Sequence, residues 1–164
     1  MINFVKATEK DIPLLRKLAE KSWHSAYAEI LSKNQIEYML TEMYSESEIL
    51  NQLQNPNYHY YLIVVDELPA GFMGFEFHYE EDITKLHRIY LLEQFKGKGI
   101  GKKGLQFLKE KVAETLDQRI ILNVNKDNPA KKMYESQGFK TYNEEVFDIG
   151  NGFVMDDFLM EYFL

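Results

Sequence analysis

The segment "FKGKGIGKKG", Phe95 to Gly104, places four glycines and four lysines in ten residues. Such a segment is typical of a loop that holds an anion, because glycine lets the main chain approach a ligand closely. Two loop patterns fit it. Gly99, Gly101 and Gly104 match the G-x-G-x-x-G spacing of a dinucleotide-binding turn, whereas Lys96, Gly99 and Gly101 match a second spacing, [Q/R]-x-x-G-x-[G/A], with lysine in first place. The flanking sequence has to decide between them.

Three consecutive strands are predicted directly before this loop. The stretch "YYLIVV", 60–65, is rich in β-branched and aromatic residues, and the turn signal "DELP" connects it to "AGFMGFEFHY", 70–79. A third strand, about 84–91, runs directly into the loop. We therefore expect an antiparallel meander in this part of the chain.

A helix and a further strand are predicted after the loop. Leu105, Leu108, Val112 and Leu116 follow one another at spacings of three or four residues, so a helix should begin at the glycines and pack on the sheet. The stretch "RIILNV", 119–124, then reads as a buried strand. The order strand, loop, helix, strand requires a right-handed crossover and one parallel pair within an otherwise antiparallel sheet.

The remaining segments complete the predicted order β-α-α-α-β-β-β-α-β-α-β-β. Capping boxes begin two of the helices, and "NPAKKMYESQGF" predicts a short helix that Asn128 caps. These further elements are a strand at 2–6, a helix of about four turns after Thr8, helices beginning at 32–35 and 45–48, the short helix after Asn128, and strands near 140–147 and 152–162.

The dinucleotide interpretation of the loop is disfavoured by its surroundings. A dinucleotide-binding fold needs a doubly wound parallel sheet and an acidic residue at the end of the next strand, about twenty positions on. Here that strand ends with residues 122–125, and the first carboxylate is Asp127. The antiparallel strands before the loop also disagree with it.

Composition limits the class of protein. A chain of 164 residues with 45% hydrophobic residues can bury one sizeable core, so we expect a single domain, 1–164. The net charge of −7 argues against a general nucleic-acid or anionic-membrane binder. The lysines of the loop are therefore a local feature, suited to one anion, whereas the acidic remainder would favour a cationic second substrate.

The residue types exclude several kinds of chemistry. The chain has no cysteine, so disulfides, thiolate metal sites and a cysteine nucleophile are ruled out. The N-terminus lacks the layout of a signal peptide, and no apolar run reaches the length of a membrane span, so we expect a soluble, cytoplasmic protein. The four histidines, His24, His59, His78 and His87, have no close ligand spacing, and no metal site is expected.

At this point the chain resembles a known family, the GCN5-related N-acetyltransferases (GNAT), which transfer acetyl from acetyl-CoA to amines. The resemblance covers almost the whole chain and rests on "RIYLLEQFKGKGIGKKGLQFL" followed by "LNVNKDNPAKKMYESQGF". It implies an α/β (α+β) fold, the GNAT fold, with a central, mostly antiparallel sheet, one parallel pair and helices on both faces. The segments "SWHSAY" and "GFVMDDFLMEYFL" further resemble the PaiA-like, polyamine-acetylating branch.

The resemblance also implies which residues bind the cofactor, acetyl-CoA. Main-chain N–H groups at a helix N-terminus present donors and a positive dipole end to the pyrophosphate. Gln94, Gly97 and Gly99 fit the loop pattern as well as Lys96, Gly99 and Gly101 do, but the second register leaves Leu91 at the strand end. The cofactor-binding residues implied are Ile89, Tyr90 and Leu91 for the pantetheine arm, Gly97, Lys98, Gly99, Ile100, Gly101 and Lys102 for the pyrophosphate, Lys96 at the start of the loop, and Asn128. Only five residues separate Asn128 from Tyr134, where many relatives have six, so Asn128 is expected to act mainly as a helix cap.

The resemblance places the catalytic acid at Tyr134, which would protonate the departing thiolate. With no cysteine and no recognisable Ser-His-Asp order, direct attack by the amine in a ternary complex is favoured over an acyl-enzyme. Many relatives carry a glutamate as base where this chain has Lys85 and Asn123. His87, whose unperturbed pKa lies near 6.5, is the candidate base, and ordered water is the alternative.

The resemblance implies that the acceptor is a primary amine, and the PaiA-like ends and the acidic charge favour a small polyamine. Trp23 and Tyr27 are candidate acceptor contacts, because the first helix lines the acceptor site in this family. Asp156 and Asp157 point to opposite faces of the last strand, so at most one can face the site, and Asp156 is our candidate. A protein N-terminus and an antibiotic amine stay open as alternative acceptors. A non-catalytic acyl-CoA sensor stays open as an alternative function. An exposed C-terminal strand could also pair two copies into a homodimer.

Overall fold

The structure, a computed structural model, describes residues 1–164. Its strands are β1 (Ile2–Lys6), β2 (Tyr58–Val65), β3 (Leu68–Glu80), β4 (Ile83–Leu91), β5 (Arg119–Asn125), β6 (Lys140–Gly150) and β7 (Phe153–Phe163). Its helices are α1 (Ile12–Tyr27), α2 (Lys33–Met43), α3 (Glu46–Gln54), α4 (Ile100–Ala113) and α5 (Ala130–Ser136). The order of helices and strands agrees with the one predicted.

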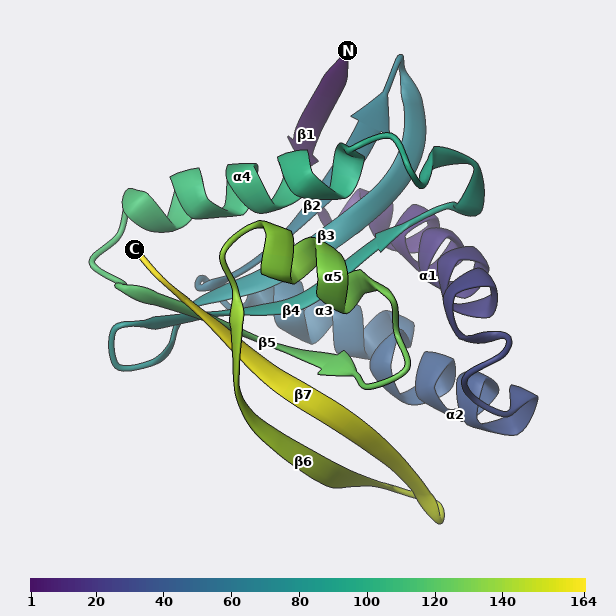
Figure 1. Cartoon of the computed structure of the whole chain (residues 1–164). Helices are drawn as coiled ribbons and strands as arrows, with labels where there is room; N and C mark the ends of the chain where they lie inside the picture. The colour runs from purple at the N-terminus through teal and green to yellow at the C-terminus, as the bar shows by residue number, and fades with distance from the viewer.

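The strands form one seven-stranded sheet in the order β1-β2-β3-β4-β5-β7-β6 (Figure 1). Every neighbouring pair is antiparallel except β4 and β5, which are parallel. A two-residue turn, Asp66 and Glu67, joins β2 to β3, and both residues have positive φ, as the right-handed twist of a hairpin favours. The predicted mostly antiparallel sheet with one parallel pair is therefore confirmed.

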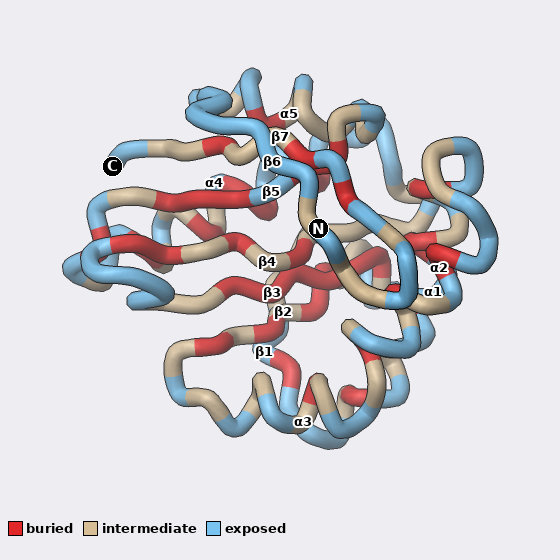
Figure 2. The backbone as a smooth tube through the Cα atoms, turned by 90° about the horizontal axis from the view of Figure 1, so that it is seen from below, coloured by how far each residue is buried: buried red, intermediate tan, exposed pale blue.

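Helices cover both faces of the sheet, and each layer has its own core (Figure 1). On one face, α1, α2 and α3 bury large side chains such as Trp23, Tyr60 and Phe72. On the other face, α4 and α5 pack on Phe75 and Leu122. Figure 2 shows the buried residues concentrated along the central strands, whereas β6, the edge strand, is mostly exposed. The predicted α/β layering is confirmed.

One predicted core residue was assigned wrongly. Leu116 continues the apolar spacing of α4, but the helix ends at Ala113 and the Leu116 side chain is exposed. The chain turns away there because the Thr115 N–H bonds to the Val112 carbonyl and because Asp117 is buried against Thr84. In addition, none of the helices combines the length and the apolar character that crossing a membrane requires.

Candidate active site

The parallel pair β4 and β5 is only half formed. The two strands pair from Ile83 opposite Arg119 to Leu86 opposite Leu122, and no further. Beyond that point β4 continues to pair with β3, and β5 with β7, so the two strands diverge. Their inner edges carry main-chain N–H and C=O groups that need partners from elsewhere. We call this opening the fork; an extended ligand could bond to its edges as an added strand would.

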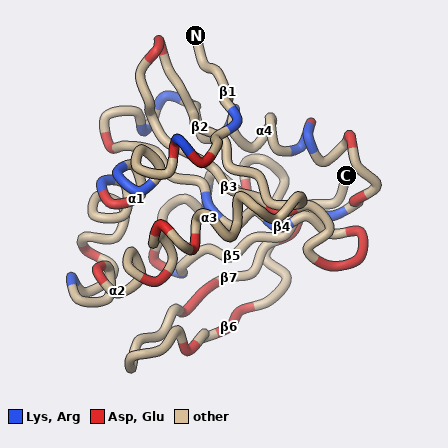
Figure 3. The backbone as a smooth tube through the Cα atoms, turned by 180° about the vertical axis from the view of Figure 1, so that it is seen from behind, with Lys and Arg blue, Asp and Glu red and all other residues tan.

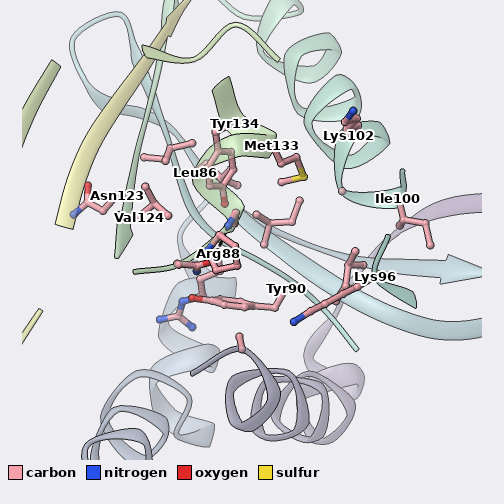
Figure 4. A pocket seen from close by; sticks show the side chains of 18 of the residues that line it. Leu86, Arg88, Tyr90, Lys96, Ile100, Lys102, Asn123, Val124, Met133 and Tyr134 are labelled. Carbon is pink, nitrogen blue, oxygen red and sulfur yellow. Dashed lines mark hydrogen bonds between the residues drawn. The ribbon is translucent and has the colours of Figure 1, made fainter. Parts of the chain in front are cut away.

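A cavity of about 400 Å³ occupies the fork. Figure 4 shows Tyr134 and Met133 reaching into it from α5, with Lys96 and Ile100 on one side and Asn123 and Val124 on the other. Its lining includes most of the site residues predicted from the sequence: Tyr27, His87, Ile89, Tyr90, Leu91, Lys96, Gly97, Gly99, Ile100, Gly101, Lys102, Asn128 and Tyr134.

The glycine loop ends in the N-terminus of α4. Gly97 and Gly99 have φ of +77° and +76°, a left-handed conformation that glycine adopts without strain. A Cβ on either residue would meet nothing within 4 Å, so the requirement for glycine here is one of backbone conformation. The first N–H to bond back is that of Lys103, to the Gly99 carbonyl. The N–H groups of residues 100–102 are therefore free for an anion, at the positive end of the helix dipole.

The side chains around the loop differ in how they face the cavity. Lys96 and Lys102 line it, although Lys96 also pairs with Glu93 at 3.2 Å. Lys98 does not line it, and its Nζ lies 5.9 Å from the centre of the Phe95 ring. Gly101 has a different role from the two loop glycines, because a Cβ there would lie 2.5 Å from the Met133 sulfur.

Tyr134 lies on α5 and is buried, with its ring packed edge-on against Phe139. Burial raises the pKa of Tyr134, and the nearby Tyr27 raises it further. The phenol therefore stays protonated well above neutral pH. A protonated hydroxyl at the wall of the cavity can donate a hydrogen bond or a proton to an anion that forms there.

A polar cluster forms the wall below α1. The hydroxyls of Tyr27 and Tyr90 lie 3.0 Å apart, and the Asn128 amide donates to the Tyr27 hydroxyl at 3.4 Å. The carbonyl oxygen of the Asn128 side chain accepts a hydrogen bond from the N–H of Ala130, the first residue of α5. Pro129 occupies the N-cap position of α5, so Asn128, the predicted cap, bonds to the first turn from one residue before that position, and it also contacts Tyr27. Burial raises the pKa of both tyrosines.

His87 is the extra residue of a β-bulge. Arg88 pairs with Gly74 and Leu86 pairs with Phe75, which leaves His87 with no residue opposite it. The ring stacks on Tyr58, and its Nε2 lies 3.0 Å from Glu76 Oε1. Burial lowers the pKa of His87 to about 4, despite the Glu76 carboxylate, which acts in the other direction. The ring is therefore neutral at pH 7.

The structure adds one charged residue that the sequence did not single out. Arg88 lines the cavity from β4, is buried, and donates from Nη1 to the Tyr60 hydroxyl. Its guanidinium lies 4.2 Å from the centre of the Tyr44 ring. The bulge turns Leu86 toward α4 and Arg88 toward α1, and nothing in the residue spacing indicates a bulge. The only signal in the sequence was an arginine inside a predicted strand.

Two candidate acceptor residues lie outside the cavity. Trp23 is buried, its ring packs at a tilt against Tyr27 and Tyr90, and its indole N–H donates to the Tyr44 hydroxyl at 3.0 Å. Asp156 is exposed and pairs with Lys126 at 3.2 Å. Of the two adjacent aspartates, Asp157 is the buried one.

One protein-family model matches this chain. Residues 17–139, which extend from within α1 to just beyond the end of α5, match the model of the acetyltransferase (GNAT) family. Two curated proteins are similar over nearly their whole length. An uncharacterized N-acetyltransferase from the pepI 3′ region of Lactobacillus delbrueckii subsp. lactis is 25% identical over 98% of this chain and 96% of its own. The spermidine N(1)-acetyltransferase of Thermoplasma acidophilum is 26% identical over 94% and 96%.

Solved structures show the same architecture. The PaiA N-acetyltransferase of Thermoplasma acidophilum, crystallised with coenzyme A, superposes with a TM-score of 0.84 at 25% identity, covering 100% of this chain and 99% of that one. A GCN5-related N-acetyltransferase from Rhodopseudomonas palustris gives a TM-score of 0.83 at 15% identity over 99% and 95%. At 15% identity the second match supports the fold alone.

Proposed function

The chain belongs to the GNAT family of acetyltransferases, and on that premise we propose that it transfers acetyl from acetyl-CoA to a primary amine of a small polyamine. That it is an N-acetyltransferase follows from the family and from its relatives. The polyamine rests on one observation, the similarity along nearly the whole chain to a spermidine N(1)-acetyltransferase. The acidic net charge agrees with a cationic acceptor.

The fork suits the cosubstrate, acetyl-CoA, whose thioester supplies an activated acetyl group. The free N–H groups of residues 100–102 would bind its pyrophosphate, and Gly97 and Gly99 would hold the main chain in the conformation this needs. The unpaired inner edge of β4 at residues 89–91 would bond to the amides of the pantetheine arm, as an added strand would. The reactive end would then lie where the strands diverge, beside Tyr134.

We place the proton donor at Tyr134. In direct attack the amine nitrogen forms a bond to the acetyl carbon while the carbon–sulfur bond breaks, so the sulfur leaves as a thiolate that needs a proton. The Tyr134 hydroxyl lines the cavity and is protonated at neutral pH, because burial raises its pKa. After each transfer, water would return the proton to the phenol.

The amine must lose a proton before or during attack, and His87 is the candidate acceptor. Its ring is neutral at pH 7, and a ring that donates its Nε2–H to Glu76 keeps a free lone pair on Nδ1. A histidine with a pKa of about 4 is a weak base, however, so ordered water is the competing route. Turnover of His87→Gln that equals that of the wild type would assign the step to water.

Thiol release from acetyl-CoA, measured with spermidine and a panel of other amines, tests the function. We expect turnover with spermidine above that with an aminoglycoside or a peptide N-terminus. Turnover on those acceptors alone would keep the acetyltransferase and reject the polyamine. Binding of acetyl-CoA without turnover on any amine would identify a non-catalytic sensor, a role for which the replacement of the usual glutamates by Lys85 and Asn123 is the supporting observation.

A further inference from the structure

Asp157 on β7 is a buried carboxylate without a partner. The residue is only 6% exposed, and its Oδ1 accepts no hydrogen bond. The other acidic residues of β7 are paired: Asp156 with Lys126, and Glu161 with Arg119. Burial, and to a lesser extent the charge of Asp156, raise the pKa of Asp157 to about 6, although Lys85 acts to lower it. A buried carboxylate in this state is costly and calls for an explanation.

The position of Asp157 connects it to the cavity. It is paired with Asn125 on β5, on the same face as Met155, which packs among α1 and α2. Its charge reaches Tyr27, whose pKa it helps to raise, and Tyr27 lines the cavity. Asn123, also in the lining, precedes Asn125 by two residues, about 7 Å along the strand. Asp157 thus lies beyond the mouth of the fork, on the α1 side.

The surroundings of Asp157 are acidic. The hairpin of β6 and β7 carries six carboxylates and one lysine, and Figure 3 shows acidic stretches on both strands. A cation that approaches the fork along this hairpin is attracted by its field.

We propose that Asp157 binds a second ammonium group of the acceptor while the amine to be acetylated lies at the fork. This assignment rests on the proposed function and deepens it, because it restricts the acceptor to amines with another positive charge a few bonds away. The reacting nitrogen has to be neutral to attack, and a carboxylate beside it would stabilise the charged form instead. A second ammonium keeps its charge, and its binding satisfies the buried carboxylate.

Two acceptors with the same four-carbon chain, one with a second amine and one without, separate this role of Asp157 from a role in chemistry or folding. Initial rates of thiol release are measured for the full chain with 1,4-diaminobutane and with 1-aminobutane, for the wild type and for Asp157→Asn, which keeps the shape and removes the charge. We expect the kcat/KM of the variant for the diamine to fall by about 10- to 100-fold, mainly through KM, because a charge left without its partner in a buried pair is costly. The kcat/KM for the monoamine should stay within about twofold, since that acceptor has no group for Asp157 to bind.

Asp148→Asn, on β6 of the same hairpin, is the matched control, because Asp148 is exposed and the hydrogen bond that its Oδ1 accepts from the Gly150 N–H can be kept by asparagine; the kcat/KM for both acceptors should stay within about twofold. Equal losses for the two acceptors in Asp157→Asn would overturn the proposal and place Asp157 in the chemical step or in folding. An unchanged diamine preference would overturn it as well. Asp157→Ser provides a second variant if the first does not fold.

Failure of the proposed function would be recognised separately. A wild type that binds coenzyme A but acetylates no amine rejects the transferase. In that case calorimetric titration of the coenzyme A complex with 1,4-diaminobutane still decides on Asp157: weaker binding to Asp157→Asn supports the site, and equal binding, or none to the wild type, rejects it.

Discussion

The two sides of the fork are built from different parts of the chain. On the loop side, residues 96–102 and the edge of β4 are almost consecutive, and they present mainly main-chain groups to the cavity. On the α1 side, the polar groups of the lining are side chains from three distant segments, Tyr27, Tyr90 and Asn128, and Asp157 lies beyond the mouth of the fork. The loop side therefore depends on local backbone geometry, and the α1 side depends on how the whole chain folds.

This difference suggests how the two sides differ in function. Main-chain donors at a helix N-terminus recognise a phosphate group in any protein that folds this way, so the loop side suits a shared cosubstrate. Side chains held by tertiary packing can be exchanged one at a time without loss of the fold, so the α1 side suits an acceptor that differs among relatives. Tyr134 stands between them, on α5.

The largest effect on turnover is expected from substitution of Tyr134, the proposed proton donor. Tyr134→Phe removes only the hydroxyl that we assign to the leaving sulfur, so kcat should fall by about 100- to 1,000-fold, in the range of general acid catalysis. The affinity for acetyl-CoA should change by less than about twofold, because the ring and its packing on Phe139 remain. Steady-state rates of thiol release and titration with coenzyme A measure the two quantities.

Tyr162→Phe is the matched control for this substitution, because that ring also packs on Phe139 but does not line the cavity. It should leave both kcat and affinity near the wild-type values. An unchanged kcat in Tyr134→Phe would show that the Tyr134 hydroxyl does not protonate the leaving sulfur.

The same contrast explains what the sequence could predict. The order of elements, the parallel pair and the glycine loop follow from periodicity, caps and glycine spacing, which are local. The bulge at His87, the orientation of Arg88 and the burial of Asp157 rather than Asp156 depend on strand register, which one residue can reverse. The prediction that Leu116 belongs to the core was wrong for a similar reason. A tertiary contact of Asp117 ends the helical turn, although the apolar spacing continues to Leu116.

The closed end of the fork depends on Asp117. This buried carboxylate accepts hydrogen bonds from the Thr84 hydroxyl and the His78 N–H, and its Oδ1 lies 2.7 Å from His78 Nδ1. Burial alone raises its pKa, but these hydrogen bonds outweigh burial and hold the pKa below the usual value. Asp117→Asn should therefore lower the free energy of unfolding at pH 7 by about 2 kcal/mol, as measured by urea denaturation.

The lowered pKa of Asp117 also predicts how the stability lost in Asp117→Asn depends on pH. A carboxyl whose folded-state pKa is depressed contributes stability above its unfolded-state pKa of about 3.9, and this is lost as the pH falls through the folded-state value. The difference between the wild type and Asp117→Asn should thus shrink as the pH falls below about 4. Glu114→Gln, in the same turn but exposed, should change stability by less than about 0.5 kcal/mol. A pH-independent difference would contradict the assignment to the charge of Asp117.

A smaller effect is expected from backbone conformation in the loop. Gly99→Val places a β-branched residue at φ +76°, which costs about 1–2 kcal/mol and should weaken acetyl-CoA binding by about tenfold. Gly152→Val is an unusually close control: φ is +79°, and a Cβ meets nothing within 4 Å at either glycine. Both variants should lose similar stability, but only Gly99→Val should lose affinity in calorimetric titrations. Equal affinities in the two would mean that the loop does not hold the cosubstrate.

The smallest effect should come from the lysines, because the loop side depends on its main chain. Lys102 lines the cavity and Lys103 does not, although both are exposed on the first turn of α4. Lys102→Ala should weaken acetyl-CoA binding by about two- to fivefold at low salt, and the loss should diminish in about 0.5 M NaCl, since exposed charges contribute little and are screened. Lys103→Ala should lose less at either salt concentration. A loss from Lys102→Ala that exceeds the loss from Gly99→Val would reverse the comparison, because a side chain, and not the backbone, would then dominate anion binding on the loop side.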